Sequence, residues 1–369
     1  MNAVYGNYPD LRNVKKILVV KLRHQGDVLL SSPVFSYLKK KLPEAEIDTF
    51  IYQETLPMLE GHPAISQFFL YDKKWKKLSF LGKVKKELSL FWQIRKNKYD
   101  LVINLTEGDR GALVALLSGA NIRVGFDPGK QGFLGKKNIY THLVKNCTTP
   151  RHTVEKNLDA LRKIGLFPQE KERDLTFVLP PDVIKKMKEL LHQKNLLPKD
   201  YILLHPVSRW RFKCPPPQLI AEVIGQLHAQ GKKIVLTSGP DRAELDLLEE
   251  IIKLSPLNST INLGGQISLK ELGALIELSG CVVCVDSVPL HIASALKTPL
   301  VVLFGPSCDK NWGPWMHPQG LVVSKTISCR PCYMDGCGGS KMSDCLYSLP
   351  VKKIIDSVNH ALDANLTSS

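Results

Sequence analysis

Short, mainly apolar runs alternate with longer amphipathic runs through most of this 369-residue sequence. The apolar runs are residues 16–22, 46–52, 67–71, 100–105, 122–126, 201–206, 233–237, 281–285 and 299–304. Apolar runs of this length are typical of strands buried on both faces of a sheet, and the intervening segments have helical periodicity. The pattern predicts an α/β fold with parallel sheets covered by helices on both faces.

The alternation occurs twice, which predicts two doubly wound domains of similar size. A chain of this length also favours two domains. The proline pair at 180–181 is a plausible boundary, so we expect domains at residues 1–181 and 182–369. The final amphipathic helix, near residues 351–364, could pack on the second domain or back on the first.

The charge is uneven along the chain. The net charge is +15, and residues 1–150 hold 24 Lys and Arg against 13 Asp and Glu. A basic amino-terminal half suggests an anionic partner, which could be nucleic acid, a phosphorylated substrate or a membrane surface.

One basic segment, residues 73–86, mixes seven lysines with Trp75 and Phe80. A solvated basic face is the plainer interpretation, but lysines mixed with aromatic residues also suit an anionic membrane interface. We predict a peripheral membrane-docking face here. Its cationic members are Lys73, Lys74, Lys76, Lys77, Lys83, Lys85 and Lys86.

Targeting and cysteine signals point to the cytoplasm. No apolar run is long enough for a membrane span, and the amino end has no apolar core followed by a cleavage site. We therefore expect reduced thiols. Four of the nine cysteines form the pattern C-x2-C-x4-C-x7-C at 329–345, which could hold zinc or iron–sulfur. The spacing is not that of two standard knuckles, so we predict a metal-free loop.

Four polar turns follow apolar strands, and ligands of open α/β sheets bind at such strand ends. These turns are HQGD (24–27), HPVSRWRFK (205–213), TSGPDRAE (237–244) and DSVPLH (286–291). In a two-domain α/β protein these ends are expected to face an interdomain cleft, the usual ligand site.

Each polar residue in these turns has both a structural and a functional interpretation. Asp27 is either a helix N-cap or a catalytic carboxylate. Ser208, Arg209 and Lys213 belong either to a solvated basic loop or to a diphosphate site.

The turn at 286–291 allows the same two interpretations. Asp286 and Ser287 could cap the following helix, or they could mark a helix start that binds phosphate. His291 could be a helix-face histidine bonded to a carbonyl.

Several familiar motifs do not occur. The sequence has no G-x-G-x-x-G, Walker A, H-E-x-x-H or G-x-S-x-G. It also has no recognition-helix or RNP pattern, so a non-catalytic nucleic-acid-binding protein is only a remote alternative, and we expect no nucleic acid partner.

Three ordered segments resemble glycosyltransferase family 9, the bacterial lipopolysaccharide heptosyltransferases. They are KILVVKLRHQGDVLLSSPV, LLHPVSRWRFK and VDSVPLHIASALKTPLVVLFGPS, and the resemblance runs from about Lys15 to the final helix. It implies a GT-B fold, in which two Rossmann-like domains face each other across a cleft. It also implies an inverting transferase without metal or cofactor, whose amino-terminal domain takes the acceptor lipid and whose carboxy-terminal domain takes ADP-heptose.

The resemblance implies a role for each matching residue. Asp27 matches the catalytic aspartate, Lys213 the lysine on the donor diphosphate, and Ser208 a hydroxyl that contacts phosphate. Asp286, Ser287 and His291 match the donor motif, whereas Val288 stands where the family often has glycine. Arg209 is grouped with these donor-binding residues. Arg123 is our candidate for an acceptor phosphate.

Within the family, HPVSRWRFK and CRPCYMDGC look most like the heptosyltransferase III type, which acts on a heptose of the lipopolysaccharide inner core. The alternatives are the heptosyltransferase I or II type or another ADP-sugar transferase of the same fold. The expected partners are ADP-heptose, an inner-core acceptor and the anionic inner membrane. We thus expect a cytoplasmic protein, peripheral on the inner membrane's cytoplasmic face.

Overall fold

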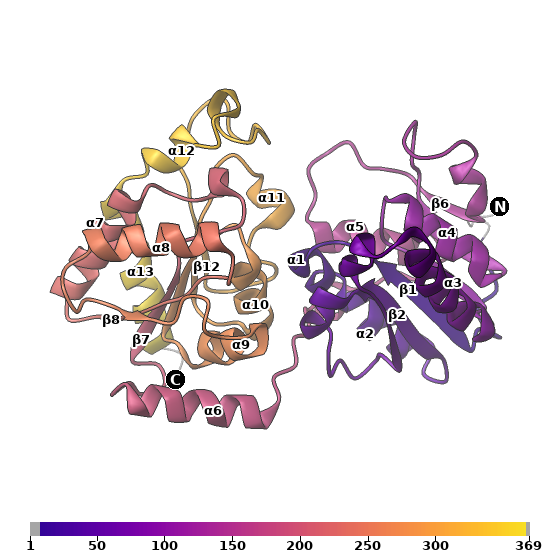
Figure 1. Cartoon of the computed structure of the whole chain (residues 1–369), viewed down its shortest axis with the longest axis horizontal. Coiled ribbons are helices and arrows are strands. Elements are labelled where there is room, and N and C mark those ends of the chain that lie inside the picture. Colours follow the sequence, from indigo (N-terminus) through magenta and orange to yellow (C-terminus); the bar gives the residue numbers. More distant parts are fainter. Residues whose placement is uncertain (1–7, 367–369) are drawn as a thin grey trace, which may run out of the picture. The chain divides into compact units, whose positions relative to one another are not determined.

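The computed structural model describes residues 8–366 and divides the chain into two compact units between Val178 and Leu179. Each unit contains one six-stranded sheet in which all the paired strands run parallel (Figure 1). The predicted α/β class with two doubly wound sheets is therefore confirmed. The boundary expected after residue 181 lies three residues beyond this division, at the first residue of helix α6.

The first unit has the sheet order β3-β2-β1-β4-β5-β6. Its strands are β1 (Lys16–Lys21), β2 (Glu46–Tyr52), β3 (Gln67–Tyr71), β4 (Leu101–Asn104), β5 (Ile122–Phe126) and β6 (His142–Val144). Its helices are α1 (Gln25–Leu29), α2 (Ser32–Lys41), α3 (Phe80–Lys96), α4 (Asp109–Ser118) and α5 (Thr153–Arg162). Short 3-10 turns are η1 (Gln53–Met58), η2 (Lys73–Lys77), η3 (Lys136–Ile139) and η4 (Glu170–Glu172).

The side chains of β1 point alternately to the two faces of the first sheet, and helices pack on both faces. Leu18 and Val20 join a core that also contains Leu90 and Ile94 of α3 and Val114 of α4. Successive strand side chains point to opposite faces, so Lys21 projects to the other side of the sheet, toward α5. That alternation matters for the site described below.

The sequence predicts one helix over residues 28–43, but the structure has a break there. Helix α1 ends at Leu29 and α2 begins at Ser32, with Pro33 as its second residue. Proline has no N–H and its ring clashes with the carbonyl four residues earlier. The break at Leu30 and Ser31 is the consequence, and it leaves α1 as a separate five-residue helix.

The second unit has the order β12-β11-β10-β7-β8-β9. Its strands are β7 (Tyr201–His205), β8 (Lys233–Leu236), β9 (Ile261–Asn262), β10 (Cys281–Val285), β11 (Leu300–Leu303) and β12 (Gly320–Val323). Its helices are α6 (Pro181–Gln193), α7 (Pro217–Ala229), α8 (Arg242–Leu254), α9 (Leu269–Leu278), α10 (Val288–Leu296), α11 (Asp309–Trp312), α12 (Asp344–Tyr347) and α13 (Val351–Leu366). Two 3-10 turns are η5 (Arg211–Lys213) and η6 (Cys337–Gly339).

Helices α7, α8 and α13 bury their apolar sides in one core with strands of the second sheet. The final helix contributes Ile354, Ile355 and Val358 to that core. Helix α6 packs against α9, as Figure 1 also shows. No helix within residues 8–366 is long and apolar enough to cross a membrane.

Several elements were not predicted. Strands β6, β9 and β12 have two to four residues each and lie at sheet edges. Strand β6 lies in a stretch expected to be loop, and β12 follows the strand expected to be the last. Helix α3 covers residues for which the sequence indicated only a basic face.

Candidate active site

The strand order reverses at one point in each sheet, and this point collects the predicted residues. In the first unit it lies between β1 and β4, and in the second between β7 and β10. Ligands of doubly wound sheets bind outside the carboxyl ends of the strands at such switch points. The turns at 24–27, 205–213 and 286–291 follow three of these four strands, β1, β7 and β10.

Asp27 lies just beyond the carboxyl end of β1. It is the third residue of α1, and His24 holds the N-cap position, so the interpretation of Asp27 as an N-cap is wrong. Its side chain is 10% exposed, and Oδ2 lies 3.9 Å from Nε of Arg23. Arg23 in turn reaches Glu107 of the loop after β4, with Nη1 3.8 Å from Oε2. The carboxylate is thus shielded and flanked by both switch-point loops.

A buried lysine beneath Asp27 was missed by the sequence analysis. Lys21 Nζ donates hydrogen bonds to the Leu105 carbonyl at 3.1 Å and to Asn157 Oδ1 at 2.9 Å. Burial lowers the pKa of Lys21 to about 8, and the negative charge of Asp27 opposes that shift. A lysine at the end of the apolar run KILVVK was the available signal, because such a residue rarely enters a core without a partner.

Asn157 connects this lysine to the helix that carries Asp27. Its Nδ2 donates to the carbonyl of Leu30 at 2.9 Å, which lies at the break after α1. A carbonyl at a helix end has no partner within the helix and needs one from elsewhere. The chain Lys21–Asn157–Leu30 therefore fixes the end of α1 relative to the end of β1.

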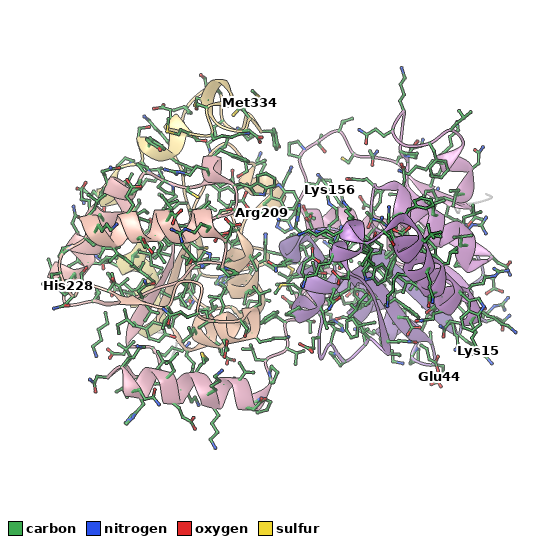
Figure 2. All side chains as sticks on the ribbon, viewed as in Figure 1. Lys15, Glu44, Lys156, Arg209, His228 and Met334 are labelled. Atoms are coloured by element: carbon green, nitrogen blue, oxygen red, sulfur yellow. The ribbon has the colours of Figure 1, made fainter. Side chains whose placement is uncertain are left out.

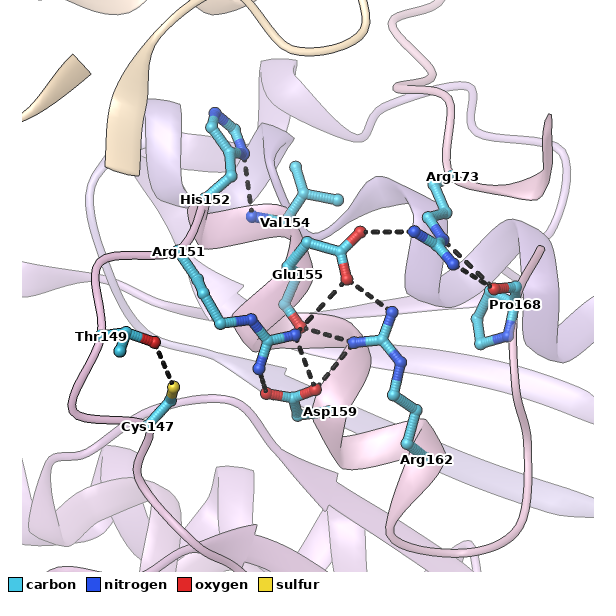
Figure 3. A network of polar contacts seen from close by, with 10 residues as sticks. All are labelled: Cys147, Thr149, Arg151, His152, Val154, Glu155, Asp159, Arg162, Pro168 and Arg173. Carbon is cyan, nitrogen blue, oxygen red and sulfur yellow. Dashed lines mark hydrogen bonds and ion pairs between the residues drawn. The ribbon is translucent and has the colours of Figure 1, made fainter. Parts of the chain in front are cut away.

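Helix α5, which carries Asn157, is anchored on its opposite side (Figure 3). Glu155 and Asp159 lie one turn apart there, and Arg162 reaches both, at 2.5 and 2.7 Å. Arg151 pairs with Asp159 at 2.7 Å, and Arg173 with Glu155 at 3.0 Å. Several bidentate or shared Arg–carboxylate contacts of this kind hold geometry better than one exposed ion pair.

The second switch point brings together two predicted donor residues from distant turns. Lys213 Nζ lies 2.6 Å from Asp286 Oδ2, and the Asp286 side chain is only 5% exposed. Asp286 follows β10, whereas Lys213 closes the long turn after β7. The ammonium has further N–H donors, so one buried carboxylate can hold it while other donors face a ligand.

The start of α10 lies directly beside this pair. Ser287 occupies the N-cap position but makes no capping hydrogen bond, and its hydroxyl donates instead to the Val285 carbonyl at 3.3 Å. Pro289 is the second helical residue, and Val288 has no positive φ, so the backbone there does not require glycine. His291 is buried on α10.

The turn after β7 presents polar groups of two kinds. The Ser208 hydroxyl accepts from the Trp210 N–H at 3.2 Å, and Arg209 is exposed, with its guanidinium 5.1 Å from the Trp210 ring centre (Figure 2). His205 was not singled out by the sequence. It is buried against Thr237, with Nδ1 2.9 Å from Oγ1, and burial lowers its pKa to about 4.

Arg123 lies apart from the group around Asp27. In the sheet it is level with Val102 and Leu18, well before the carboxyl end of β1. Its Nε donates to the Ile139 carbonyl at 2.6 Å and its Nη1 to the Ala120 carbonyl. These contacts tie β5 to neighbouring loops, so the predicted contact with an acceptor phosphate gains no support from this geometry.

The cysteine-rich segment lies in the second unit around Met334, which Figure 2 labels. Cys329, Cys332 and Cys337 are exposed and Cys345 is buried. Within the described residues, no three His, Cys, Asp or Glu side chains are arranged to hold a metal ion. The metal-free state of this loop stays a prediction.

The chain matches the family model described as glycosyltransferase family 9 (heptosyltransferase) over residues 87–342. It is 36% identical over 296 residues to lipopolysaccharide heptosyltransferase 3 of Escherichia coli, covering 80% of this chain and 85% of the relative.

Solved structures agree on the fold. A glycosyl transferase family 9 protein from Veillonella parvula superposes with a TM-score of 0.80 at 21% identity, covering 99% of this chain and 100% of the other. The E. coli heptosyltransferase WaaC, solved with ADP, gives 0.66 at 19% identity, covering 83% and 92%. The two parallel six-stranded units are thus those of a GT-B glycosyltransferase, and the chain belongs to glycosyltransferase family 9, the heptosyltransferases.

Proposed function

We propose that this enzyme transfers a heptose from ADP-heptose to a heptose of the lipopolysaccharide inner core, with inversion, in the manner of the heptosyltransferase III type. The observation that carries the proposal is the Lys213–Asp286 pair at the β7/β10 switch point, beside the start of α10. The relative named lipopolysaccharide heptosyltransferase 3 and the ADP-bound structure of WaaC support the choice of acceptor class and donor.

On the donor side, the departing ADP gains negative charge on its diphosphate. Lys213 would neutralise this charge, while Asp286 holds the ammonium in place. The start of α10 adds backbone N–H groups and the positive end of a helix dipole. Ser208, Arg209, Ser287, Val288 and His291 complete the proposed donor site.

On the acceptor side, Asp27 acts as general base. The acceptor hydroxyl gives its proton to the Asp27 carboxylate while its oxygen forms a bond to the anomeric carbon. The bond from that carbon to the diphosphate oxygen breaks, and both its electrons leave with ADP. Arg23 Nε lies 3.9 Å from Asp27 Oδ2, and the carboxylate side chain can accept the proton as the acceptor hydroxyl attacks.

The test is a transfer assay with purified enzyme, ADP-heptose and core acceptors that carry one, two or three heptoses. We expect addition of one heptose to the two-heptose acceptor, in the anomeric configuration opposite to that of the donor. Transfer to an acceptor with fewer heptoses only would assign the chain to the I or II type. Absence of transfer from ADP-heptose to every core acceptor would refute the proposal.

A further inference from the structure

Helix α3 has two apolar faces, and one of them is exposed. Its inner face places Leu90 and Ile94 in the core of the first unit. On the other side, Leu81, Leu88 and Trp92 are 78, 62 and 64% exposed. These three residues are spaced i, i+7 and i+11, which places them on one stripe of a helix.

Cationic side chains flank this stripe. Lys85 and Lys96 are exposed and fall on the same side of the helix, since they follow Leu81 by one and four turns. Lys96 Nζ lies 5.3 Å from the centre of the Trp92 ring. Residues 72–98 hold ten Lys and Arg against two Asp and Glu. The stripe is therefore apolar along its centre and basic along its border.

The neighbouring helix extends the apolar surface. Helix α4 packs beside α3 (Figure 1) and exposes Leu113, Leu116 and Leu117, which share one side of the helix. At its carboxyl end, a Cβ on Gly119 would lie 1.3 Å from Nη1 of Arg95, so the two helix ends touch. In total, ten of the twenty exposed large apolar residues among the described residues lie between 78 and 134.

The structure also shows that part of the basic segment faces inward. Trp75 packs on Tyr71, with 4.9 Å between ring centres, and joins the edge of the core. Lys73 pairs with Glu54 at 2.6 Å and lies over the Tyr52 ring. Both therefore leave the docking face that the sequence predicted. Phe80, which is 80% exposed, remains in it.

We propose that the outer face of α3, together with the exposed leucines of α4, binds the surface of an anionic lipid bilayer. The docking face is defined by Lys77, Leu78, Phe80, Leu81, Lys85, Leu88, Trp92, Lys96, Leu113, Leu116 and Leu117, which are all exposed. An exposed apolar patch of this extent on a folded unit indicates a binding surface. The inference goes beyond the proposed transferase activity and does not depend on it.

The chemistry of the face favours lipid over a protein partner. Lysines have long alkyl stems that lie along apolar surface while their ammonium groups reach the phosphate level of a bilayer. Tryptophan prefers the same boundary, because its ring is apolar and its N–H is polar. The core of a protein interface is instead depleted in lysine.

The rigid mounting of α3 supports a preformed docking face. Arg110 of α4 donates to the Tyr71 hydroxyl at 3.0 Å and to Glu87 of α3 at 3.3 Å, and the Tyr71 hydroxyl donates to Glu87 at 2.8 Å. The inner face is thus fixed by polar contacts as well as by apolar packing. The docking face could therefore bind a bilayer without a change in the fold of α3 or α4.

The test is co-sedimentation of the full chain with vesicles of phosphatidylcholine alone or mixed with phosphatidylglycerol, in the absence of donor and acceptor. We expect binding to the anionic vesicles only, weakened at high salt because exposed charge attraction is screened. Each cation near an anionic surface strengthens partitioning about fivefold. The variant Lys77→Gln/Lys85→Gln/Lys96→Gln should therefore bind on the order of 100-fold more weakly.

The apolar contribution is tested separately. Leu81→Ser/Leu88→Ser/Trp92→Ser keeps every charge and should also lose binding, whereas a purely electrostatic surface would tolerate it. The matched control, Lys185→Gln/Lys188→Gln/Lys194→Gln, removes three exposed lysines from α6 and its C-cap position and should bind as wild type does. Circular dichroism checks that each variant is folded.

Three results would overturn the proposal. The first is wild type that does not bind anionic vesicles, and the second is a serine variant that binds them as well as wild type. The third comes from sedimentation velocity: a wild-type dimer that the serine variant abolishes, without vesicle binding, would assign this face to a second copy of the chain.

Discussion

At the residue scale, the proposed general base, Asp27, and the proposed diphosphate ligand, Lys213, are held in different ways. Asp27 is shielded and has a cation at some distance, since Arg23 Nε lies 3.9 Å away. Lys213 is held by one short contact to a buried carboxylate. A proton acceptor needs a free lone pair, whereas a phosphate ligand needs a fixed cation, so each arrangement suits its proposed task.

Replacement of Asp27 by Asn should leave a folded enzyme that binds ADP as well as wild type. The amide cannot accept the proton, so turnover should fall by about 100-fold or more, the usual size of a general-base effect. Steady-state transfer kinetics and ADP calorimetry provide the two measurements. Asp10→Asn, at an exposed ion pair with Arg12, is the control and should change neither. Near-normal turnover of the Asp27 variant would exclude the assignment.

Replacement of Lys213 by Ala should weaken ADP binding. Loss of one charge-assisted contact costs about 1.5–3 kcal/mol, which corresponds to roughly 10- to 100-fold in affinity. Lys253→Ala removes an exposed lysine from α8 in the same unit and should bind ADP normally. Calorimetry that finds equal ADP affinity in both variants would remove Lys213 from the donor site.

At the element scale, α1 is too short to define its own position, and its neighbours do so. The carbonyl of Leu30 accepts from Asn157 of α5, and Asn157 accepts from Lys21 of β1. The arginine–carboxylate network of Figure 3 holds α5 from the other side. Asp27 is therefore positioned by a strand and a helix that are far apart in the sequence.

This arrangement makes Lys21 and Asn157 positioning residues. Asn157→Ala removes both hydrogen bonds and should lower kcat while leaving the KM for ADP-heptose unchanged. Lys21→Met removes the ammonium that donates to Asn157, so it should likewise lower kcat at an unchanged KM. A purely structural role would lower the Tm of the variants without this split between kcat and KM.

The control for both variants is Lys156→Ala, the residue before Asn157, which Figure 2 labels. It should keep wild-type kcat and KM. If Lys21→Met also keeps wild-type kcat, Lys21 does not position Asp27.

The sequence predicted the turns of the candidate active site because each is a local pattern: an apolar strand, then a polar turn, then a helix. The pairing of Lys213 with Asp286 can be predicted once it is known that their turns follow two adjacent strands, β7 and β10. The contact of Lys21 with Asn157 does not follow, since it joins residues 136 positions apart. Helix α3 was missed because apolar residues on two faces obscure a one-sided helical period.

At the scale of the whole molecule, both units repeat one plan in different sequences. Each sheet has its first and fourth strands at the switch point, and each unit also contains a buried histidine that lies beside a hydroxyl group. His62 of the first unit lies 3.3 Å from the Ser36 hydroxyl, and His205 of the second contacts Thr237. Burial lowers the pKa of each from 6.5 to about 4.

These two histidines should make both units sensitive to acid. Between pH 6.5 and about 4, the unfolded chain binds a proton that the folded chain does not, so the free energy of unfolding falls as the pH falls through this window. A shift of this size corresponds to about 3 kcal/mol for each histidine. Above pH 6.5 neither group contributes to the pH dependence.

Thermal unfolding between pH 7 and pH 4.5 measures this effect. His62→Gln and His205→Gln should each show a smaller drop in Tm than wild type, because glutamine cannot take up the proton. Since two units need not unfold together, each variant should flatten the pH dependence of one transition only. His228→Gln, at an exposed position on α7, should keep the full wild-type drop. If both buried-histidine variants also keep it, carboxylates rather than these histidines govern the acid unfolding of the molecule.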